Sequence, residues 1–207
     1  MATALRVTRL FFRLAAAELA FSGPMKISRR ENKLQMKKLY IHIGLPKTAS
    51  SLVQKFLYEN PIALSEHGLH YVKSGLDLNL RCHHKLVWTL GLHVPPKYVD
   101  TSISNGKEDL LDNLIAENTK YAEKDLIISS ELLTFLNDFS ELGELLDIFC
   151  NREILFVVVL RPQDEFLESL YQQIVKDGSA MKFWDWVDMS IKVADYNYLV
   201  RRIMRIA

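Results

Sequence analysis

The sequence is poor in cysteine, has no long uninterrupted apolar stretch and carries almost no net charge. Its two cysteines, Cys82 and Cys150, form neither a disulfide framework nor a metal-binding pattern, which favours two thiols in a reducing compartment. The apolar stretch over residues 10–21 is interrupted by Arg13 and Glu18 and is far shorter than the roughly 20 residues that span a bilayer. The sequence therefore predicts no transmembrane segment and no metal site, and it favours a cytoplasmic location.

The net charge of +1 conceals an uneven distribution along the chain. Residues 1–40 contain nine Lys or Arg and two acidic residues, a net charge of +7, whereas residues 41–207 contain seventeen and twenty-three, a net charge of −6. Proteins that bind nucleic acids through a broad surface usually present a basic face to the phosphates. The acidic main part of the chain therefore argues against a nucleic-acid partner.

Residues 1–36 differ in character from the rest of the chain. They are rich in arginine and poor in acids, as are mitochondrial transit peptides and helices that lie on a membrane surface. A simpler interpretation is a poorly structured N-terminal extension without a folded role, because Met36-Lys37-Lys38 stands directly before a predicted strand. We favour the extension; organelle targeting and peripheral membrane association are the alternatives.

The remaining residues, 37–207, suit one α/β domain. Short apolar segments with the pattern of strands alternate along the chain with amphipathic segments that have the pattern of helices. This order is typical of a parallel β-sheet flanked by helices. The uniformly apolar run 154–160 is expected to be buried on both faces, and Arg201, Arg202 and Arg205 are expected to point outward from a last helix. The predicted strands are 39–43, 69–72, 125–131 and 154–160, and the predicted helices include 51–59, 81–90, 109–120, 141–150 and 195–206.

The stretch 38–58 reads as a strand, a short loop and the first turns of a helix. Free N–H groups and the positive end of a helix dipole favour an anion in such a loop. Lys47 adds a positive charge, and Thr48, Ser50 and Ser51 add hydroxyl groups. The lysine comes too early for the Walker A pattern, which requires Gly-Lys-Ser/Thr beside the helix.

A second cationic position follows the last apolar strand. Arg161 stands where that strand ends, and Pro162 prevents extension of the strand. A helix is predicted to start at Asp164 or Glu165, with Phe166, Leu170 and Ile174 on its inner face. Ser169 lies eight residues after Arg161 on this helix. A guanidinium group and a hydroxyl in this arrangement can hold a phosphate from two sides. Ligands of parallel sheets bind at the carboxyl ends of strands, so the 44–51 loop, Ser129–Glu131 and Arg161 are expected on one edge.

Both segments resemble motifs of sulfotransferases that use PAPS (3′-phosphoadenosine 5′-phosphosulfate). The run Pro46-Lys47-Thr48-Ala49-Ser50-Ser51 is similar to Pro-Lys-x-Gly-Thr-Thr, with alanine in place of the glycine and serines in place of the threonines. Arg161, Ser169 and Tyr171 keep the offsets of Arg-x-Pro-x-x-Arg-x-x-Ser-x-Tyr, although the proline is one position early and Phe166 replaces the inner arginine. The resemblance spans roughly residues 38–200 and implies a P-loop NTPase-like sulfotransferase fold. Family members continue beyond this length, so a C-terminal part is expected to be missing.

The resemblance implies sulfuryl transfer from PAPS to a hydroxyl or amine, without a metal. The cofactor-binding loop would be Pro46–Ser51: Lys47 would neutralise charge on the departing group, and the backbone amides of residues 47–51 with Ser50 and Ser51 would hold the 5′-phosphate. Arg161 and Ser169 would hold the 3′-phosphate. A general base is expected near the loop. The candidates are His83, His84 and Glu131, with His83 slightly favoured over His84.

The acceptor is not readable from the sequence and is a carbohydrate, a lipid or a small molecule. Two other functions are left open. One is a catalytically incomplete sulfotransferase-like protein that binds nucleotide. The other, less favoured, is a P-loop kinase, which the chain matches poorly because it lacks Gly-Lys-Ser/Thr and ends its third strand in Ser-Ser-Glu.

Overall fold

The computed structural model describes residues 36–95, 98 and 106–205. Residues Lys37–Ala207 form one compact unit. The predicted N-terminal extension lies outside the described residues, apart from Met36. No helix in the described ranges is both long and apolar enough to cross a membrane.

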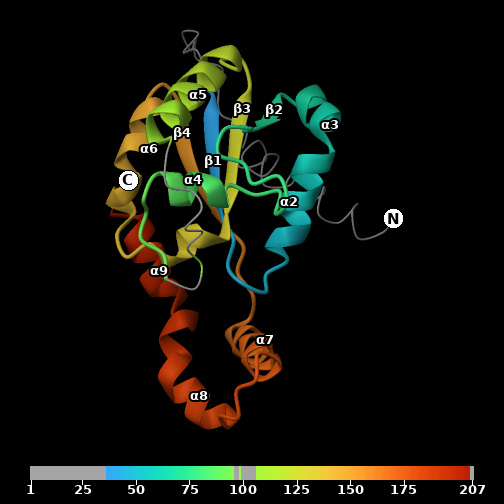
Figure 1. The fold of residues 1–207 in the computed structure, drawn as a ribbon, viewed down its shortest axis with the longest axis vertical. Helices are drawn as coiled ribbons and strands as arrows, with labels where there is room; N and C mark the ends of the chain where they lie inside the picture. Colours follow the sequence, from blue (N-terminus) through green and yellow to red (C-terminus); the bar gives the residue numbers. More distant parts are fainter. Residues whose placement is uncertain (1–35, 96–97, 99–105, 206–207) are drawn as a thin grey trace, which may run out of the picture. The chain divides into compact units, whose positions relative to one another are not determined.

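A four-stranded parallel sheet forms the centre of this unit (Figure 1). The strand order is β2-β3-β1-β4, so β1 lies between β3 and β4. The strands are β1 (Lys38–Ile43), β2 (Leu69–Tyr71), β3 (Asp125–Ser130) and β4 (Glu153–Val158). The predicted α/β class, a parallel sheet flanked by helices, is confirmed.

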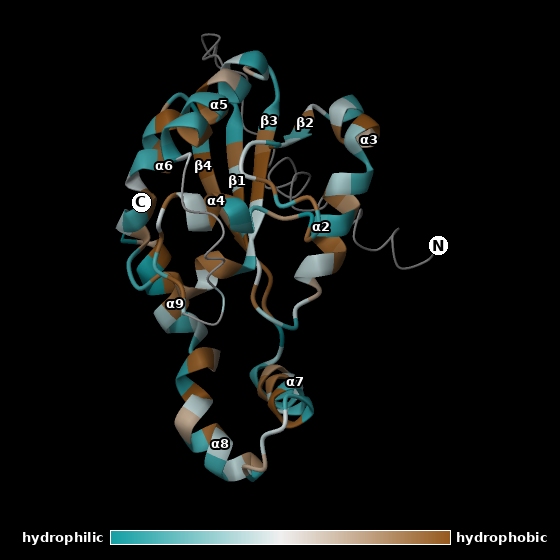
Figure 2. Ribbon diagram, in the orientation of Figure 1, coloured by the Kyte–Doolittle hydropathy of each residue, from teal (hydrophilic) through white to brown (hydrophobic). Residues whose placement is uncertain are grey.

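Burial follows the position of each strand in the sheet. Leu39, Ile41 and Ile43 of β1 are completely buried, and β3 is buried from Leu126 to Ser130. Figure 2 shows apolar residues gathered in these strands, while the helices around them carry mixed colours. The prediction that 154–160 is buried on both faces is wrong, because Ile154–Val158 are only partly buried. Among the described strands β4 pairs with β1 alone and forms an edge of the sheet.

The helices that follow the strands begin close to the predicted positions, with two differences. Predicted helix 81–90 is shortened because Arg81 has φ of 60°, which a right-handed helix does not allow. Predicted helix 141–150 divides into a 3-10 turn and a short α-helix. The α-helices are α2 (Ser50–Glu59), α3 (Pro61–Glu66), α4 (His84–Thr89), α5 (Lys107–Lys120), α6 (Gly143–Ile148), α7 (Gln163–Lys176), α8 (Phe183–Ser190) and α9 (Tyr196–Ile203), and the 3-10 helices are η2 (Glu131–Phe135), η3 (Phe139–Leu142) and η4 (Ile191–Ala194).

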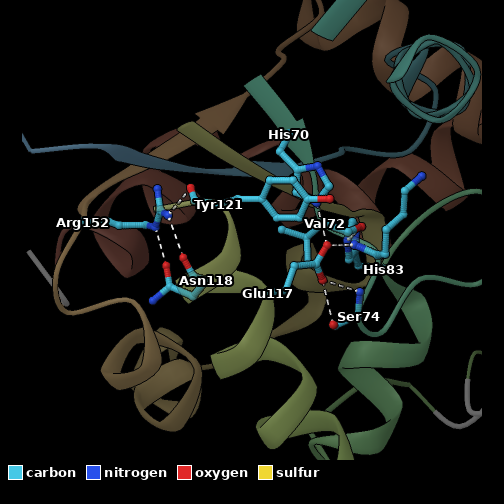
Figure 3. A network of polar contacts seen from close by, with 9 residues as sticks. His70, Val72, Ser74, His83, Glu117, Asn118, Tyr121 and Arg152 are labelled. Carbon is cyan, nitrogen blue, oxygen red and sulfur yellow. Dashed lines mark hydrogen bonds and ion pairs between the residues drawn. The ribbon is translucent and has the colours of Figure 1, made fainter. Parts of the chain in front are cut away.

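Glu117 of α5 fixes the chain that leaves β2 (Figure 3). Its carboxylate accepts hydrogen bonds from the amides of Lys73 and Ser74 at 2.7 and 2.9 Å, and from Ser74 Oγ at 2.7 Å. His70 Nε2 lies 2.6 Å from the same carboxylate, and the His70 ring stacks on Tyr121. Burial opposes the charged carboxylate, but these hydrogen bonds lower the pKa of Glu117 to about 2.

Arg152 binds the C-terminal end of α5, which is close in sequence to Glu117 (Figure 3). This arginine is 4% exposed and donates to the carbonyls of Asn118, Tyr121 and Lys124 and to the Asn118 side chain. The last carbonyls of a helix lack partners within it, and a cation there also interacts favourably with the helix dipole. Arg152 therefore joins the end of α5 to the start of β4.

Replacing the Glu117 carboxylate with an amide tests this network. We expect Glu117→Gln to lower the free energy of unfolding by about 2–3 kcal/mol at pH 7, because charge-assisted hydrogen bonds are lost and the new NH2 faces N–H donors. Since the folded-state pKa lies below the ordinary value, the contribution is present above pH 4.5 and falls as the pH approaches about 2. Urea unfolding at pH 7 and pH 3 measures both effects. Asp112→Asn, an exposed change in α5, is the control, and an equal loss in both variants would contradict the role of Glu117.

Candidate functional site

The loop between β1 and α2 is held in place by its own hydroxyl groups. Thr48 Oγ1 donates to the carbonyl of Leu45 at 2.6 Å, and Ser50 Oγ reaches the same carbonyl at 3.2 Å. Both residues are buried, whereas Ser51 is exposed at the first turn of α2. A Cβ on Gly44 would lie 2.5 Å from Ser50 Oγ, so glycine is required there by close packing. Thr48 and Ser50 thus shape the loop, and Ser51 is the hydroxyl best placed for a ligand.

Two non-glycine residues of this loop adopt left-handed backbone conformations. Lys47 has φ of 63° and Ala49 has φ of 64°. An L-residue in this region is strained by about 1–2 kcal/mol, and such strain is concentrated at functional sites. Ala49 has a positive φ, a conformation that glycine adopts more readily than alanine. It precedes α2, whose N-terminus has no side-chain cap.

The Lys47 ammonium group is held by α7. Lys47 Nζ donates to Gln173 Oε1 at 2.7 Å, and Gln173 Nε2 donates to Asp177 Oδ1 at 2.8 Å. Gln173 is a site residue that the sequence analysis missed. The sequence feature that could have identified Gln173 is its position one helical turn after Ser169, on the same face of α7.

Arg161 lies beside the Lys47 turn. Its Nη1 donates to the Lys47 carbonyl at 3.4 Å, and its Nε donates to Glu165 at 3.0 Å. Glu165, Ser169 and Gln173 are spaced by four residues and share one stripe of α7. Ser169 therefore lies between the residues that contact Arg161 and Lys47. The predicted proximity of the 44–51 loop and Arg161 is confirmed.

A cavity of about 760 Å³ opens next to this turn. Residues 45–47 and 49–51 of the loop form one wall, and residues of α4, α7, η2, η4 and α9 contribute the others together with Tyr98. Of the predicted site residues, Pro46, Lys47, Ala49, Ser50, Ser51 and Glu131 line it. Thr48, Arg161 and Ser169 are not among the lining residues. Its size is that of a site for one drug-sized ligand.

The preference for His83 over His84 as general base is corrected by the geometry. His83 is completely buried, its Nε2 donates to the Val72 carbonyl at 2.9 Å, and its Nδ1 accepts from the Ser129 amide at 3.1 Å. Burial lowers the pKa of His83 to about 4. Both ring nitrogens are therefore engaged away from the cavity, and His83 connects β3 to the chain after β2.

His84 lines the cavity instead. Its Nδ1 lies 2.8 Å from Ser130 Oγ. Burial lowers the pKa of His84 to about 4, and the negative charge of Asp77 offsets this only in part. His84 is therefore neutral at pH 7 and weakly basic.

Of the three candidate bases, Glu131 has the most suitable position. It follows β3 directly, lines the cavity and faces Lys47 and Ser50. Burial raises the pKa of Glu131, although the charge of Lys47 and a hydrogen bond from Ser50 act in the opposite direction. A carboxylate with a raised pKa accepts a proton near neutral pH more readily than an ordinary glutamate.

Arg202 does not point outward as predicted. It donates to the carbonyls of Leu136 and Thr134, and its guanidinium carbon lies 4.8 Å from the centre of the Tyr198 ring. Burial lowers its pKa. The hydrophobic pattern of α9 could not predict these contacts, because the two carbonyls belong to Thr134 of η2 and to Leu136, which follows η2, far away in the sequence.

No cluster of three or more His, Cys, Asp or Glu that could hold a metal ion is found in the described part of the chain. No protein-family model matches the chain, and the search of curated proteins gives no significant match. One solved structure, the Pnkp1/Rnl/Hen1 RNA repair complex, aligns with 82% of this chain at 15% identity and a TM-score of 0.39. The chain spans about half, 47%, of the length of the matched chain. A TM-score at this level does not establish a shared fold.

The left-handed conformation of Ala49 gives a direct test of the loop. We expect Ala49→Gly to raise the free energy of unfolding by up to about 1 kcal/mol, because glycine adopts positive φ without strain. The same change at Ala63, an exposed position within α3, should instead lower it by about 0.5–1 kcal/mol. Urea unfolding measures both variants. Equal losses would show that Ala49 is not strained.

Proposed function

We propose that this chain binds a PAPS-type donor and transfers its sulfuryl group to a hydroxyl or amine acceptor. The observation that carries the proposal is the convergence of two cationic residues 114 positions apart, with Arg161 Nη1 3.4 Å from the carbonyl of Lys47. An adenosine donor with a phosphate at each end needs two such positions. They lie after neighbouring strands of a parallel sheet, the region where ligands of such sheets bind.

The residues of the loop fit the 5′ end of the donor. The uncapped N-terminus of α2 offers backbone N–H groups and a positive dipole, and Ser51 adds an exposed hydroxyl. Arg161 and Ser169 would hold the 3′-phosphate. Arg161 would then exchange its exposed partner Glu165 for phosphate oxygens.

The donor supplies an activated sulfuryl group. Lys47 would leave Gln173 and stabilise the negative charge that develops on the bridging oxygen. Glu131 would remove the proton of the acceptor hydroxyl as its oxygen bonds to sulfur and the bond from sulfur to the 5′-phosphate oxygen breaks. Neutral His84 would orient the acceptor by a hydrogen bond.

Nucleotide titrations distinguish this function from a P-loop kinase. We expect 3′,5′-ADP to bind more tightly than ATP with magnesium. Arg161→Gln should weaken 3′,5′-ADP binding by about 10- to 100-fold, because a charge-assisted hydrogen bond contributes about 1.5–3 kcal/mol. Calorimetry of both proteins measures the effect, with 5′-AMP as a ligand that lacks the 3′-phosphate.

Arg201→Gln, an exposed change in α9, is the control and should leave binding unchanged. Preferential binding of ATP with magnesium would support the kinase. Weak binding of both nucleotides would contradict the proposed donor site. Binding of 3′,5′-ADP without transfer to any acceptor would indicate a nucleotide-binding protein that lacks catalysis.

The role of Glu131 predicts a pH profile. The deprotonated carboxylate is the active form, so kcat/KM should fall as the pH decreases through a pKa above that of an ordinary glutamate. We expect Glu131→Gln to lower kcat by about 10²- to 10⁴-fold and to abolish this acidic limb. Sulfuryl transfer from PAPS measured between pH 4.5 and 8.5 provides the data. Glu168→Gln, an exposed change in α7, should keep the wild-type profile; an unchanged profile in Glu131→Gln would assign the proton to another group.

A further inference from the structure

The cavity next to Lys47 is distinct from the positions proposed for the 3′ end of the donor. Lys47, Ser50 and Ser51 line it, whereas Arg161 and Ser169 do not. The side chains proposed to hold the 3′-phosphate therefore lie outside the lining of the cavity. In the proposed function, which this inference extends, the cavity is the place for the acceptor.

The walls of the cavity are mainly apolar and partly aromatic. Leu45 and Leu170 contribute aliphatic surface, and Phe166 contributes a ring. Tyr98 and Phe135 stack on each other with ring centroids 4.9 Å apart and lie side by side in the wall. Such surfaces favour a ligand with a flat apolar body.

Several polar groups of the wall are already engaged by the protein. Arg202 donates to two carbonyls of the η2 segment, and Asp195 accepts the Tyr198 amide as the N-cap of α9. Thr134 Oγ1 donates to the Gly44 carbonyl at 3.1 Å. These three residues therefore offer few free partners to a sugar with many hydroxyls, and each unpaired polar group that is buried weakens binding.

Several of the remaining polar side chains lie at the loop end of the cavity, while Lys192 of η4 and Tyr198 of α9 line other walls. Lys47, Ser50, Glu131 and His84 line the loop end, in the region assigned to the reaction. An acceptor that fits both parts has an apolar body and one polar group at its end. We infer that the acceptor is a compact aromatic compound of one to three rings with a single hydroxyl or amine, and not a carbohydrate.

The test uses 2-naphthol as the probe, with glucosamine and n-octanol as a polar and an aliphatic comparison. Calorimetry of the full chain is run with saturating 3′,5′-ADP, so that no transfer is required. We expect 2-naphthol to bind at least about tenfold more tightly than either comparison compound. Tighter or equal binding of glucosamine or octanol would overturn the inference.

Two residues of η4 give a matched pair of variants. Val193 and Ile191 are 52% and 51% exposed, but only Val193 lines the cavity. Val193→Asp should weaken 2-naphthol binding about tenfold or more, because a carboxylate would face the apolar ligand, whereas Ile191→Asp should leave it unchanged. Equal effects of the two changes would overturn the inference.

The binding of 3′,5′-ADP separates the two proposals. Unchanged nucleotide binding in Val193→Asp shows that the variant is folded and that only the acceptor cavity has changed. If 3′,5′-ADP binds and 2-naphthol does not, the acceptor class is wrong and the donor site stands. If 3′,5′-ADP does not bind to the unmodified chain, the proposed function itself fails, whatever 2-naphthol does.

Discussion

The parallel pairing of β1 with β3 and β4 determines where Lys47, Glu131 and Arg161 lie. Ile43 is paired with Ser130 on one side and with Val158 on the other, so the chain leaves all three strands at the same level. Gly44 and Glu131 are therefore immediate neighbours, and a Cβ on Gly44 would lie 2.8 Å from Glu131 Cγ. Arg161 follows the end of β4 and donates a hydrogen bond to the Lys47 carbonyl. One register thus places a carboxylate, an ammonium group and a guanidinium group around one short loop.

Neutral polar residues form a hydrogen-bond network around Ser129, at the end of β3 next to the site. His42 Nδ1 and Gln54 Nε2 both contact Ser129 Oγ, at 2.8 and 3.1 Å, and His83 accepts the Ser129 amide. These contacts join β1, α2, β3 and the start of α4 at a single serine. Burial lowers the pKa values of His42 and His83 to about 4, so both rings are neutral at pH 7 and add no positive charge to this network. The histidines nearest the strand ends are therefore parts of the scaffold, whereas His84, one residue later, reaches the cavity.

The local hydrophobic pattern of the sequence predicted most helices and strands, whereas features that depend on long-range packing could not be predicted from it. The strands, the strand–loop–helix segment and the position of Arg161 followed from apolar periodicity and from the rule that parallel strands end at one edge. Composition could not show that β4 is an edge strand in the described part of the chain, because an apolar run looks the same at the centre and at the edge. The choice between His83 and His84 depended on where α4 begins, and the positive φ of Arg81 moved that start by three residues from the predicted one. The inward position of Arg202 required the carbonyls of Thr134 and Leu136, which no local window contains.

The present partners of the two cationic groups also bear on how an anion would enter. Arg161 pairs with Glu165 four residues later, and these side chains are 38% and 54% exposed. Exposed pairs of this kind contribute at most about 1 kcal/mol, and Lys47 is held by a neutral amide rather than by a carboxylate. In the proposed function, a phosphate would displace both partners at small cost and gain stronger charge-assisted hydrogen bonds in return. The hydroxyls of Thr48 and Ser50 hold the turn, in which Lys47 and Ala49 have positive φ. The conformation of the turn therefore does not depend on where the Lys47 side chain points, and the loop would keep its shape during this exchange.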